Sequence, residues 1–397
     1  MDGQPPIAAA TGNDPISRAR SVVKLLKASR ARIEAARELP SDVVGALHEA
    51  RLFRILLPRS LGGDAIDLVS LAKVTEIVSA ADASAGWCIG QGGGCAMSAA
   101  YLEPEAAARL FGRPDAVLAW GAGIQGTAVA APGGYRVTGT WTFASGSRHA
   151  TLLGGHSRIV EADGTPRLRP DGRPADLTAL FARSQARIHD VWQVMGLKGT
   201  GSDTFEVRDL FVPASDTIDR ESQETACRHG TIYHFPTTIA YAAAFAGVML
   251  GIARGTLDDL RDLAMTKTPR GAASSMRESE AFQRDLGVLE ARFRAARAYL
   301  HATLAEVWDD VAGGSRLTME HRIACRLATT HAINEGVDVV ARAYRLAGQT
   351  AIFEANPFEQ RLRDAHAASQ QVQGRATHYV TVGRHFLGLP PDTTMFI

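Results

Sequence analysis

The stretch WQVMGLKGTGSDTFEVRDLFVP, Trp192 to Pro213, decides how the centre of the chain is interpreted. Three glycines, Gly196, Gly199 and Gly201, precede a segment in which apolar residues alternate with polar ones. A dinucleotide-binding glycine motif must follow a strand and begin a helix. Here the alternation starts after the glycines, which predicts a tight turn that leads into a β-strand. Glycines at these positions let the backbone pass close to a flat partner.

Residues 116–226 around this stretch have a β pattern throughout. GGYRVTGTWTFASG begins with a turn dipeptide and then alternates through Val137 and Trp141, with Gly139 marking a turn or bulge. The segment ADLTALFA is a further short strand, and the Gly-, Pro- and Arg-rich residues before it form a surface hairpin or loop. We therefore expect a compact β unit in the middle of the chain.

The segments on both sides of the β unit are helical. Residues 1–15 are expected to be a flexible leader, and residues 16–115 carry helical periodicity, with Ser41 as the N-cap of DVVGALHEARLF. Residues 227–397 are helical again. An apolar stripe with spacings of three and four predicts a long bundle helix through Leu286, Leu289, Phe293, Ala296, Leu300, Leu304, Val307 and Val311. Two more long helices are expected at Thr318–Leu346 and Phe358–Phe386.

The composition is that of an ordinary globular protein. The chain has 397 residues, a net charge of +1, 46% hydrophobic and 21% charged residues, so no basic excess indicates nucleic acid or an anionic membrane. The four cysteines form no CxxC pair, which indicates neither a metal site nor a disulfide scaffold. The apolar run from Thr237 is rich in alanine and glycine and reads as a buried helix. We expect a soluble, cytoplasmic protein without a secretory signal.

Five motifs in this order resemble the acyl-CoA dehydrogenase superfamily over nearly the whole chain. They are LPRSLGG at Leu57, DASAGW at Asp82, GTWTFASGSRHA at Gly139, the opening stretch, and RLRDAH at Arg361. Within the superfamily the chain is most similar to the two-component flavin-dependent monooxygenases. The resemblance implies an α+β, mainly α fold with a helical domain (16–115), a β-barrel domain (116–226) and a four-helix bundle (227–397). It also implies a homotetramer.

The resemblance implies an activity as well. Reduced FMN or FAD, supplied by a separate flavin reductase, would react with O2 to form a C4a-hydroperoxyflavin that hydroxylates a small aromatic or polycyclic organic substrate. Phe143 would cover one face of the flavin, and the Ser145 hydroxyl would form a hydrogen bond near N5. Further flavin contacts would come from Trp192, Gly199, Thr200 and Ser202. Arg270 would reach the flavin phosphate, often that of a neighbouring subunit, or would be an ordinary loop arginine.

Several residues have both a functional and a structural interpretation. His149 would orient substrate or flavin, but a lone histidine after a strand is often structural. Trp87, Trp120 and His366 are candidates for the substrate pocket. The glycine cluster that follows Trp87 follows a helical pattern and not a strand, so we interpret it as small residues for close helix packing.

The last helix separates the possible reaction classes. Dehydrogenases of the superfamily need a carboxylate as base, and one common place for it is nine or ten residues after the arginine of RDA, where this chain has Val372 and Gln373. The monooxygenases usually place a histidine nearby, and the residue that aligns best is Gln371, which cannot take a proton at neutral pH. His366 and His378 are the possible substitutes. A spacing of seven would place His378 on the same helical face as Gln371.

Three alternatives stay open at this stage. The chain would be an acyl-CoA dehydrogenase if its base lay elsewhere in the sequence. It would be an N-hydroxylase if a neutral amine or amino sugar attacked the oxygen without help from a base, which suits Gln371. It would be a flavin-free homologue with a binding or scaffold role if it had kept only the fold.

Overall fold

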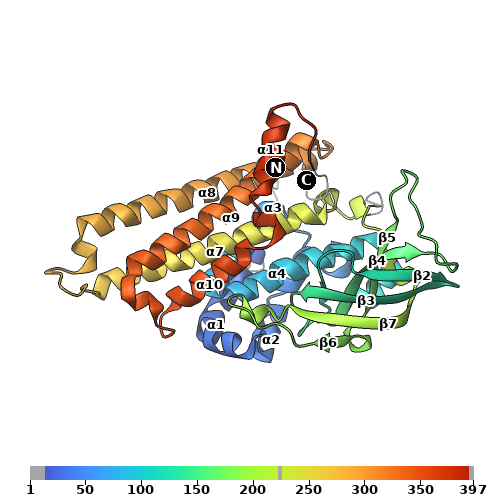
Figure 1. Cartoon of the computed structure of the whole chain (residues 1–397), viewed down its shortest axis with the longest axis horizontal. Helices are drawn as coiled ribbons and strands as arrows, with labels where there is room; N and C mark the ends of the chain where they lie inside the picture. The colour runs from blue at the N-terminus through green and yellow to red at the C-terminus, as the bar shows by residue number, and fades with distance from the viewer. Residues whose placement is uncertain (1–13, 222–225, 393–397) are drawn as a thin grey trace, which may run out of the picture.

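The computed structural model describes residues 14–221 and 226–392, and it has a sheet at one end of a long helical bundle (Figure 1). The N-terminal helices lie against the bundle beside the sheet. This is the mainly helical α+β arrangement that the sequence predicts. The expected leader lies almost wholly outside the described residues, and Asp14 already caps the first helix through the N–H groups of Ile16 and Ser17.

Five helices precede the sheet. They are α1 (Pro15–Ala36), α2 (Ser41–Glu49), α3 (Leu68–Ala81), α4 (Ala83–Ala96) and α5 (Pro104–Phe111). The expected N-cap at Ser41 is wrong, because the carbonyl of Pro40 accepts the N–H of Val44 and Ser41 is already helical. Asp82 separates α3 from α4, and its side chain accepts the N–H of Ala85 at 2.8 Å.

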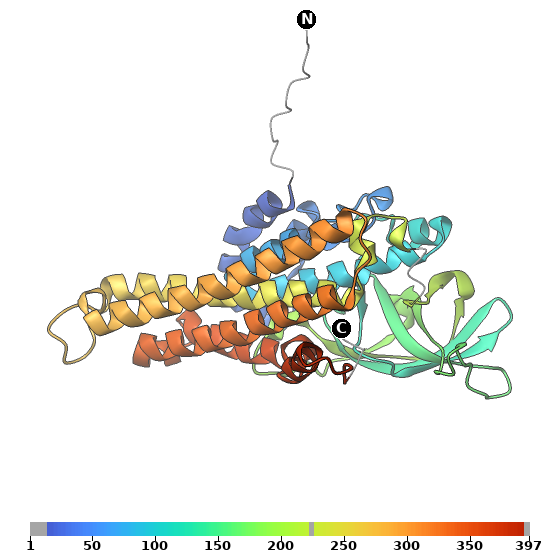
Figure 2. The same cartoon turned by 90° about the horizontal axis from the view of Figure 1, so that it is seen from above.

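The strands form one mixed, strongly curved sheet. They are β1 (Leu118–Trp120), β2 (Gly126–Ala131), β3 (Gly134–Ala144), β4 (Leu152–Val160), β5 (Asp176–Ala182), β6 (Arg187–His189), β7 (Asp203–Pro213) and β8 (Thr217–Ile218). The order is β6-β7-β3-β2-β4-β5-β8, and β1 pairs with β4. No pairing in the described part of the chain joins β6 to β8, so the sheet curls around its core without closing (Figure 2). That core contains Trp141, Phe181 and Phe205.

The predicted bulge and alternation of β3 are confirmed, and the predicted Gly-Gly turn lies one residue earlier than expected. The turn between β2 and β3 consists of Pro132 and Gly133, because Gly134 already pairs with Ala131 as the first residue of β3. The β3–β7 register shifts between Val137 and Gly139, where the sequence predicts a bulge. Val137 and Trp141 are fully buried, as the alternation requires. The regular part of β3 therefore packs in the core of the sheet. The C-terminal end of β3 is directed toward α4 and the bundle (Figure 1).

The bundle consists of α7 (Thr237–Thr266), α8 (Glu280–Ala312), α9 (Met319–Ala347) and α10 (Pro357–Ser369), followed by α11 (Thr377–Phe386). The predicted α8 stripe is buried, apart from the half-buried Leu286. Helix α7 is long and apolar enough to cross a membrane by length and composition, but 83% of that window is buried inside the protein. It is therefore the core helix that the sequence predicts.

The single helix expected over Phe358–Phe386 is wrong. Helix α10 ends at Ser369, a 3-10 turn follows at Val372–Gly374, and α11 begins at Thr377. Side chains of α9 stabilise the break, because Asn334 donates to the Gly374 carbonyl at 3.0 Å. The Gly374 carbonyl has no helical N–H to accept where the helix breaks, and a side chain of the neighbouring helix supplies the hydrogen bond instead.

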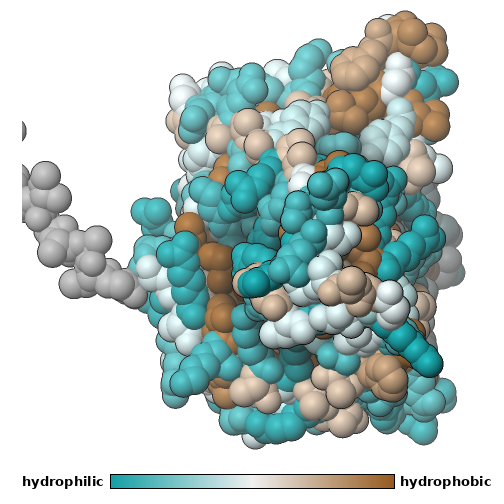
Figure 3. Space-filling model, turned by 90° about the vertical axis from the view of Figure 1, so that its left-hand side faces the viewer, coloured by the Kyte–Doolittle hydropathy of each residue, from teal (hydrophilic) through white to brown (hydrophobic). Residues whose placement is uncertain are grey.

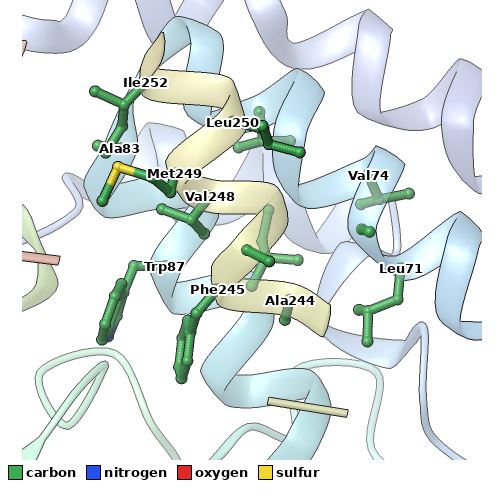
Figure 4. Close-up of a cluster of buried hydrophobic side chains, with 14 of the residues drawn as sticks. Leu71, Val74, Ala83, Trp87, Ala244, Phe245, Val248, Met249, Leu250 and Ile252 are labelled. Atoms are coloured by element: carbon green, nitrogen blue, oxygen red, sulfur yellow. The ribbon is translucent and has the colours of Figure 1, made fainter. Parts of the chain in front are cut away.

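Small residues let α7 pack tightly against α3 and α4. A Cβ at Gly247 would lie 2.3 Å from the Ala72 carbonyl oxygen, so a larger residue cannot fit without moving a helix. Figure 4 shows apolar side chains of α7, including Phe245 and Val248, between residues of α3 and α4. In the cluster after Trp87, a Cβ at Gly90 would lie 3.0 Å from the Ala244 side chain of α7, which confirms the interpretation of that cluster as packing residues.

We expect Gly247→Ala to lower the free energy of unfolding by about 1–3 kcal/mol, because the added methyl group overpacks the α3–α7 contact. The matched control is Gly287→Ala on α8, where a Cβ would meet nothing within 4 Å. That change should raise stability by up to about 1 kcal/mol through helix propensity. Urea unfolding followed by circular dichroism measures both. Equal effects of the two substitutions would contradict the packing argument.

Candidate active site

Strand β3 ends in an exposed aromatic residue with an unusual backbone conformation. Phe143 has φ +59°, in the left-handed region that bulky residues rarely adopt, and the β3–β7 register shifts between Trp141 and Ala144. The residue is 64% exposed, and its ring meets Trp192 edge to face, with ring centroids 6.1 Å apart. Backbone strain at an exposed aromatic residue does not serve the core, so Phe143 is a candidate functional position.

A hydroxyl chain, formed by Ser145, Ser202 and Thr200, is buried at the end of β3. The Ser145 hydroxyl accepts the indole N–H of Trp87 at 3.1 Å and lies 2.7 Å from the Ser202 hydroxyl. Ser202 lies 2.7 Å from the Thr200 hydroxyl, which donates to the Leu197 carbonyl at 2.8 Å. The structure thus brings four predicted site residues together from α4, β3 and the glycine-rich turn.

Trp87 forms one wall of this site. Its ring stacks on Phe245 with centroids 4.0 Å apart and planes 17° apart, and Phe245 stacks on Tyr241 at 5.6 Å. Figure 4 shows the Trp87 and Phe245 rings side by side, from α4 and α7. The stack fixes the plane of the indole and aims its N–H at Ser145. A contact between Trp87 and substrate remains a prediction.

The glycines of the turn are needed for a reason other than the expected flat partner. A Cβ at Gly196 would lie 2.2 Å from the Arg363 carbonyl oxygen, and one at Gly199 would lie 2.1 Å from Ile33. Both distances are too short for real contacts, so the two glycines let the turn pack on α10 and α1. These two glycines therefore have a packing reason of their own, whether or not a cofactor lies nearby. Flavin contacts from the backbone of Gly199 remain a prediction.

Asp364 joins the turn to the bundle. Its carboxylate accepts the backbone N–H of Leu197 at 2.6 Å, and Leu197 has φ +53°. Burial raises the pKa of Asp364 to about 7, and the neighbouring Asp82 adds to the rise. Burial likewise raises the pKa of Asp82 to about 6. Sequence reasoning did not assign a role to Asp364, although the motif RLRDAH contains it.

Asp203 holds the backbone of the residues that precede the glycine-rich turn. Its carboxylate accepts the N–H groups of Val191 and Trp192, each at 3.2 Å, and pairs with Arg148 at 2.7 Å. Arg148 also pairs with Asp190 at 2.7 Å. Sequence reasoning missed this carboxylate. The available signal was an acidic residue directly after the serine of GTGSD.

Three other predicted residues lie outside the hydroxyl chain. His149 packs on Phe53 with ring centroids 5.3 Å apart, and burial lowers its pKa to about 4, so it is uncharged at neutral pH. Trp120 is buried in β1 against His156, with centroids 4.9 Å apart. His366 is exposed on α10. Catalytic or substrate-binding roles for these residues remain predictions.

Gln371 and His378 lie at the break between α10 and α11. The Gln371 side chain accepts the Gln373 N–H at 2.7 Å, and Nε2 of His378 donates to the Val372 carbonyl at 2.6 Å. Because the helix breaks here, the expectation that Gln371 and His378 share a helical face is wrong. Burial lowers the pKa of His378. Both side chains therefore stabilise the turn, and catalysis by either one remains a prediction.

A polar cavity of about 620 Å³ lies beside this break. It is lined by His331, Asn334, Glu335, Val337, Asp338, Ser369, Gln370, Gly374, Arg375, Ala376 and Tyr379. Its two carboxylates, Glu335 and Asp338, both pair with Arg292 of α8. No member of the hydroxyl chain lines the cavity, so it is separate from the surface beside Phe143.

Arg270 is far from this site within one chain. It is exposed in the connection between α7 and α8, at the end of the bundle opposite the sheet (Figure 1). Figure 3 shows this end face, which is mostly hydrophilic with separate apolar areas. The part of α7 from Phe245, which stacks on Trp87 of the site, to its end at Thr266 spans roughly 30 Å, so the Arg270 side chain cannot reach a ring at Phe143 in the same chain. The expected phosphate contact therefore requires a second copy of the protein and remains a prediction.

The surroundings of Phe143 and Ser145 fit a flat, uncharged, conjugated ring. Phe143 and Trp192 offer apolar faces, and the polar wall consists of hydroxyl and peptide groups. The nearby carboxylates of Asp203 and Asp364 are occupied by backbone N–H groups. Such a surface can hold a ring between aromatic contacts and one hydrogen-bonding edge.

Comparison with known proteins agrees with this geometry. Residues 243–373 match the family model for the acyl-CoA dehydrogenase C-terminal domain. The chain is 27% identical to the flavin-dependent monooxygenase oxygenase subunit HsaA of Mycobacterium tuberculosis, with 90% of this chain and 91% of HsaA covered. It is 30% identical to the indole-3-acetate monooxygenase of Pseudomonas putida, with 89% of each protein covered. The chain is a flavin-dependent monooxygenase of the acyl-CoA dehydrogenase fold.

A solved structure of this monooxygenase family has the same architecture. XiaF from Streptomyces sp., in complex with FADH2 and glycerol, matches with a TM-score of 0.88 at 25% identity, and the match covers 96% of both chains. The predicted family, fold class and enzyme class are thereby confirmed.

We expect Phe143→Gly to separate stability from cofactor binding. Glycine accepts φ +59° without strain, and little buried surface is lost, so thermal stability should stay unchanged or rise by up to about 1 kcal/mol. Flavin affinity should fall by about tenfold because an aromatic contact is removed. Calorimetry and flavin titration measure the two effects.

Phe211→Gly on β7 is the matched control for the Phe143 substitution. Phe211 is also exposed but has no left-handed backbone. Glycine in a strand lowers the free energy of unfolding, and the Phe211→Gly substitution should leave flavin affinity unchanged. Comparable loss of stability in both variants would show that Phe143 is an ordinary strand residue.

Asp364→Asn should change how stability depends on pH. The folded-state pKa of about 7 lies above the ordinary 3.8, so folding takes up a proton and this group lowers stability as pH rises between these values. Asparagine does not titrate but keeps an oxygen for the Leu197 N–H. The variant should gain thermal stability relative to wild type as pH rises through this window.

Asp42→Asn is the control for this pH effect. Asp42 is exposed, and its hydrogen bond with Arg32 lowers its pKa. Its contribution to folding stability is therefore lost as pH falls, whereas Asp364 lowers stability as pH rises. Melting temperatures of the three proteins across the pH range give the comparison. Parallel curves for wild type and Asp364→Asn would contradict a raised pKa at Asp364.

Proposed function

We propose that the chain is the oxygenase component of a two-component system that binds reduced FMN or FAD from a separate reductase. The observation that carries the proposal is the juxtaposition of the exposed, strained Phe143 with the buried Ser145 hydroxyl. This pair offers an aromatic face and a hydrogen-bonding edge to one flat ring. Family membership and the FADH2 complex of XiaF support the choice of a reduced flavin.

Each site residue has a role in this proposal. Phe143 and Trp192 contact the ring of the flavin, while Ser145 faces its N5 edge, with Ser202 and Thr200 behind it. When bound, reduced flavin reacts with dioxygen and supplies one oxygen atom for transfer to the substrate. The protein residues hold the ring, exclude water from its N5 edge and position the substrate. Arg270 of a second copy binds the flavin phosphate.

The substrate in this proposal is a small aromatic or polycyclic organic molecule. The indole-3-acetate monooxygenase of Pseudomonas putida, named for such a substrate, supports this class. Trp87 offers an aromatic wall, and His366, exposed on α10, is the other candidate contact. Gln371 does not take a proton, so a substrate that is already electron-rich suits the site best.

Acyl-CoA dehydrogenation fits the site less well. Val372 and Gln373, which occupy a common position of the dehydrogenase base, belong to the 3-10 turn, and the Gln373 side chain accepts a hydrogen bond from Arg326. The two acidic residues of the adjacent cavity both pair with Arg292. None of these groups is arranged as a free base.

A homotetramer in the cytoplasm completes the proposal. Large apolar side chains are exposed at the C-terminal end of the described chain and after α9: Ile352, Phe353, Phe386, Leu387 and Leu389. Such exposure is typical of a surface that is covered in an assembly. The burial of α7 inside the protein supports a location away from membranes.

The test of this function supplies the purified protein with chemically reduced FMN or FAD, ¹⁸O2 and a panel of indoles and phenols. We expect one ¹⁸O atom in the product, detected by mass spectrometry, and no turnover with NADH in the absence of a reductase. The control replaces the aromatic panel with acyl-CoA and oxidised flavin. Bleaching of the flavin by acyl-CoA, with no labelled aromatic product, would contradict the proposal.

A further inference from the structure

The hydroxyl chain contains a fixed direction of hydrogen bonding. A serine or threonine hydroxyl has one proton to donate, and an indole N–H can only donate. Trp87 therefore donates to Ser145, over 3.1 Å. At the other end the Leu197 carbonyl can only accept, so the Thr200 hydroxyl donates to it over 2.8 Å. The two ends of the chain are thus settled by atom type alone.

The two contacts between these ends follow from a count of protons. Thr200 has used its proton on Leu197, so the 2.7 Å contact with Ser202 requires Ser202 to donate to Thr200. Ser202 has then used its proton, so the 2.7 Å contact with Ser145 requires Ser145 to donate to Ser202. Ser145 is left with one lone pair and no proton. Its hydroxyl can offer only an acceptor to a ligand.

We infer that this directed chain, anchored by the Leu197 carbonyl and transmitted by Thr200 and Ser202, makes the site selective for reduced over oxidised flavin. The inference rests on the proposed function, in which Ser145 faces flavin N5. N5 carries a hydrogen in reduced flavin and a lone pair in oxidised flavin. An obligatory acceptor at Ser145 therefore pairs with the reduced ring and opposes the lone pair of the oxidised one.

Thr200 is the positioning residue on which this selectivity depends. It is 2% exposed and lies behind Ser202. Without its hydroxyl, Ser202 has no acceptor there and can donate to Ser145 instead. Ser145 then accepts from Trp87 and Ser202 and is free to donate its own proton to oxidised N5. The change removes the constraint on direction while every hydroxyl can still form hydrogen bonds.

The fold should tolerate this change. The Leu197 carbonyl also accepts the Thr200 backbone N–H and the Trp192 indole N–H, each at 3.1 Å, so it keeps hydrogen-bond donors. Valine has nearly the shape of threonine. Thr200→Val therefore alters the donor pattern more than the packing, and Thr200→Ser keeps the hydroxyl as a conservative control.

The experiment measures dissociation constants of oxidised and dithionite-reduced FMN and FAD by anaerobic ultrafiltration, and it needs no turnover. Wild type should prefer the reduced form by at least about tenfold. Thr200→Val should lower this preference by about tenfold, mainly through tighter binding of oxidised flavin. For a two-electron couple, the reduction potential of the bound flavin should then fall by about 30 mV. Thr200→Ser should retain the wild-type preference.

A purely structural role for Thr200 would weaken both redox forms equally, and an unchanged ratio in Thr200→Val would overturn the inference. Ser202→Ala provides a second variant if Thr200→Val does not fold, because it also frees the Ser145 proton and should lower the preference. A wild type that binds neither form would overturn the proposed function together with the inference. A wild type that prefers reduced flavin, with variants that keep this preference, would overturn the inference alone.

Discussion

The site depends on the two backbone groups of Leu197. Its N–H is held by the buried Asp364 carboxylate of α10, and its carbonyl accepts from the Thr200 hydroxyl and the Trp192 indole. Leucine is unfavourable in the left-handed conformation that Leu197 adopts, so these hydrogen bonds hold a strained residue in place. One residue thereby connects the helical bundle to the hydroxyl chain and sets the direction of its hydrogen bonds.

The same connection explains why the turn contains glycines. Gly196 and Gly199 let the turn approach α10 and α1 so closely that side chains would overlap. The approach brings Leu197 within reach of Asp364, which lies 167 positions away in the sequence. The site is therefore positioned by three structural units together. A loop that belonged only to the sheet would lack the rigidity needed to orient single hydroxyl groups.

Much of the fold could be predicted from the sequence because local patterns determine it. The α8 stripe and the β3 bulge at Gly139 are visible as periodicity and as its interruption. The break before α11 could not be predicted, because it depends on Asn334 of another helix. In the candidate site the hydroxyl residues could be named from the motifs. The donor role of Trp87 and the anchoring role of Asp364 could not, since both arise from contacts between distant segments.

The chemistry of the proposed site depends on which of its groups can donate or accept a proton. The hydroxyl chain runs from an indole N–H to a carbonyl and contains no group that titrates near neutral pH. Burial keeps His149 uncharged, and His378 already donates to a backbone carbonyl. These two histidines and Gln371, which accepts the Gln373 N–H, thus have structural partners, and removal of a proton by any of them remains a prediction. The proposed function therefore places the reactivity needed for oxygen transfer in the substrate itself, which favours electron-rich aromatic rings.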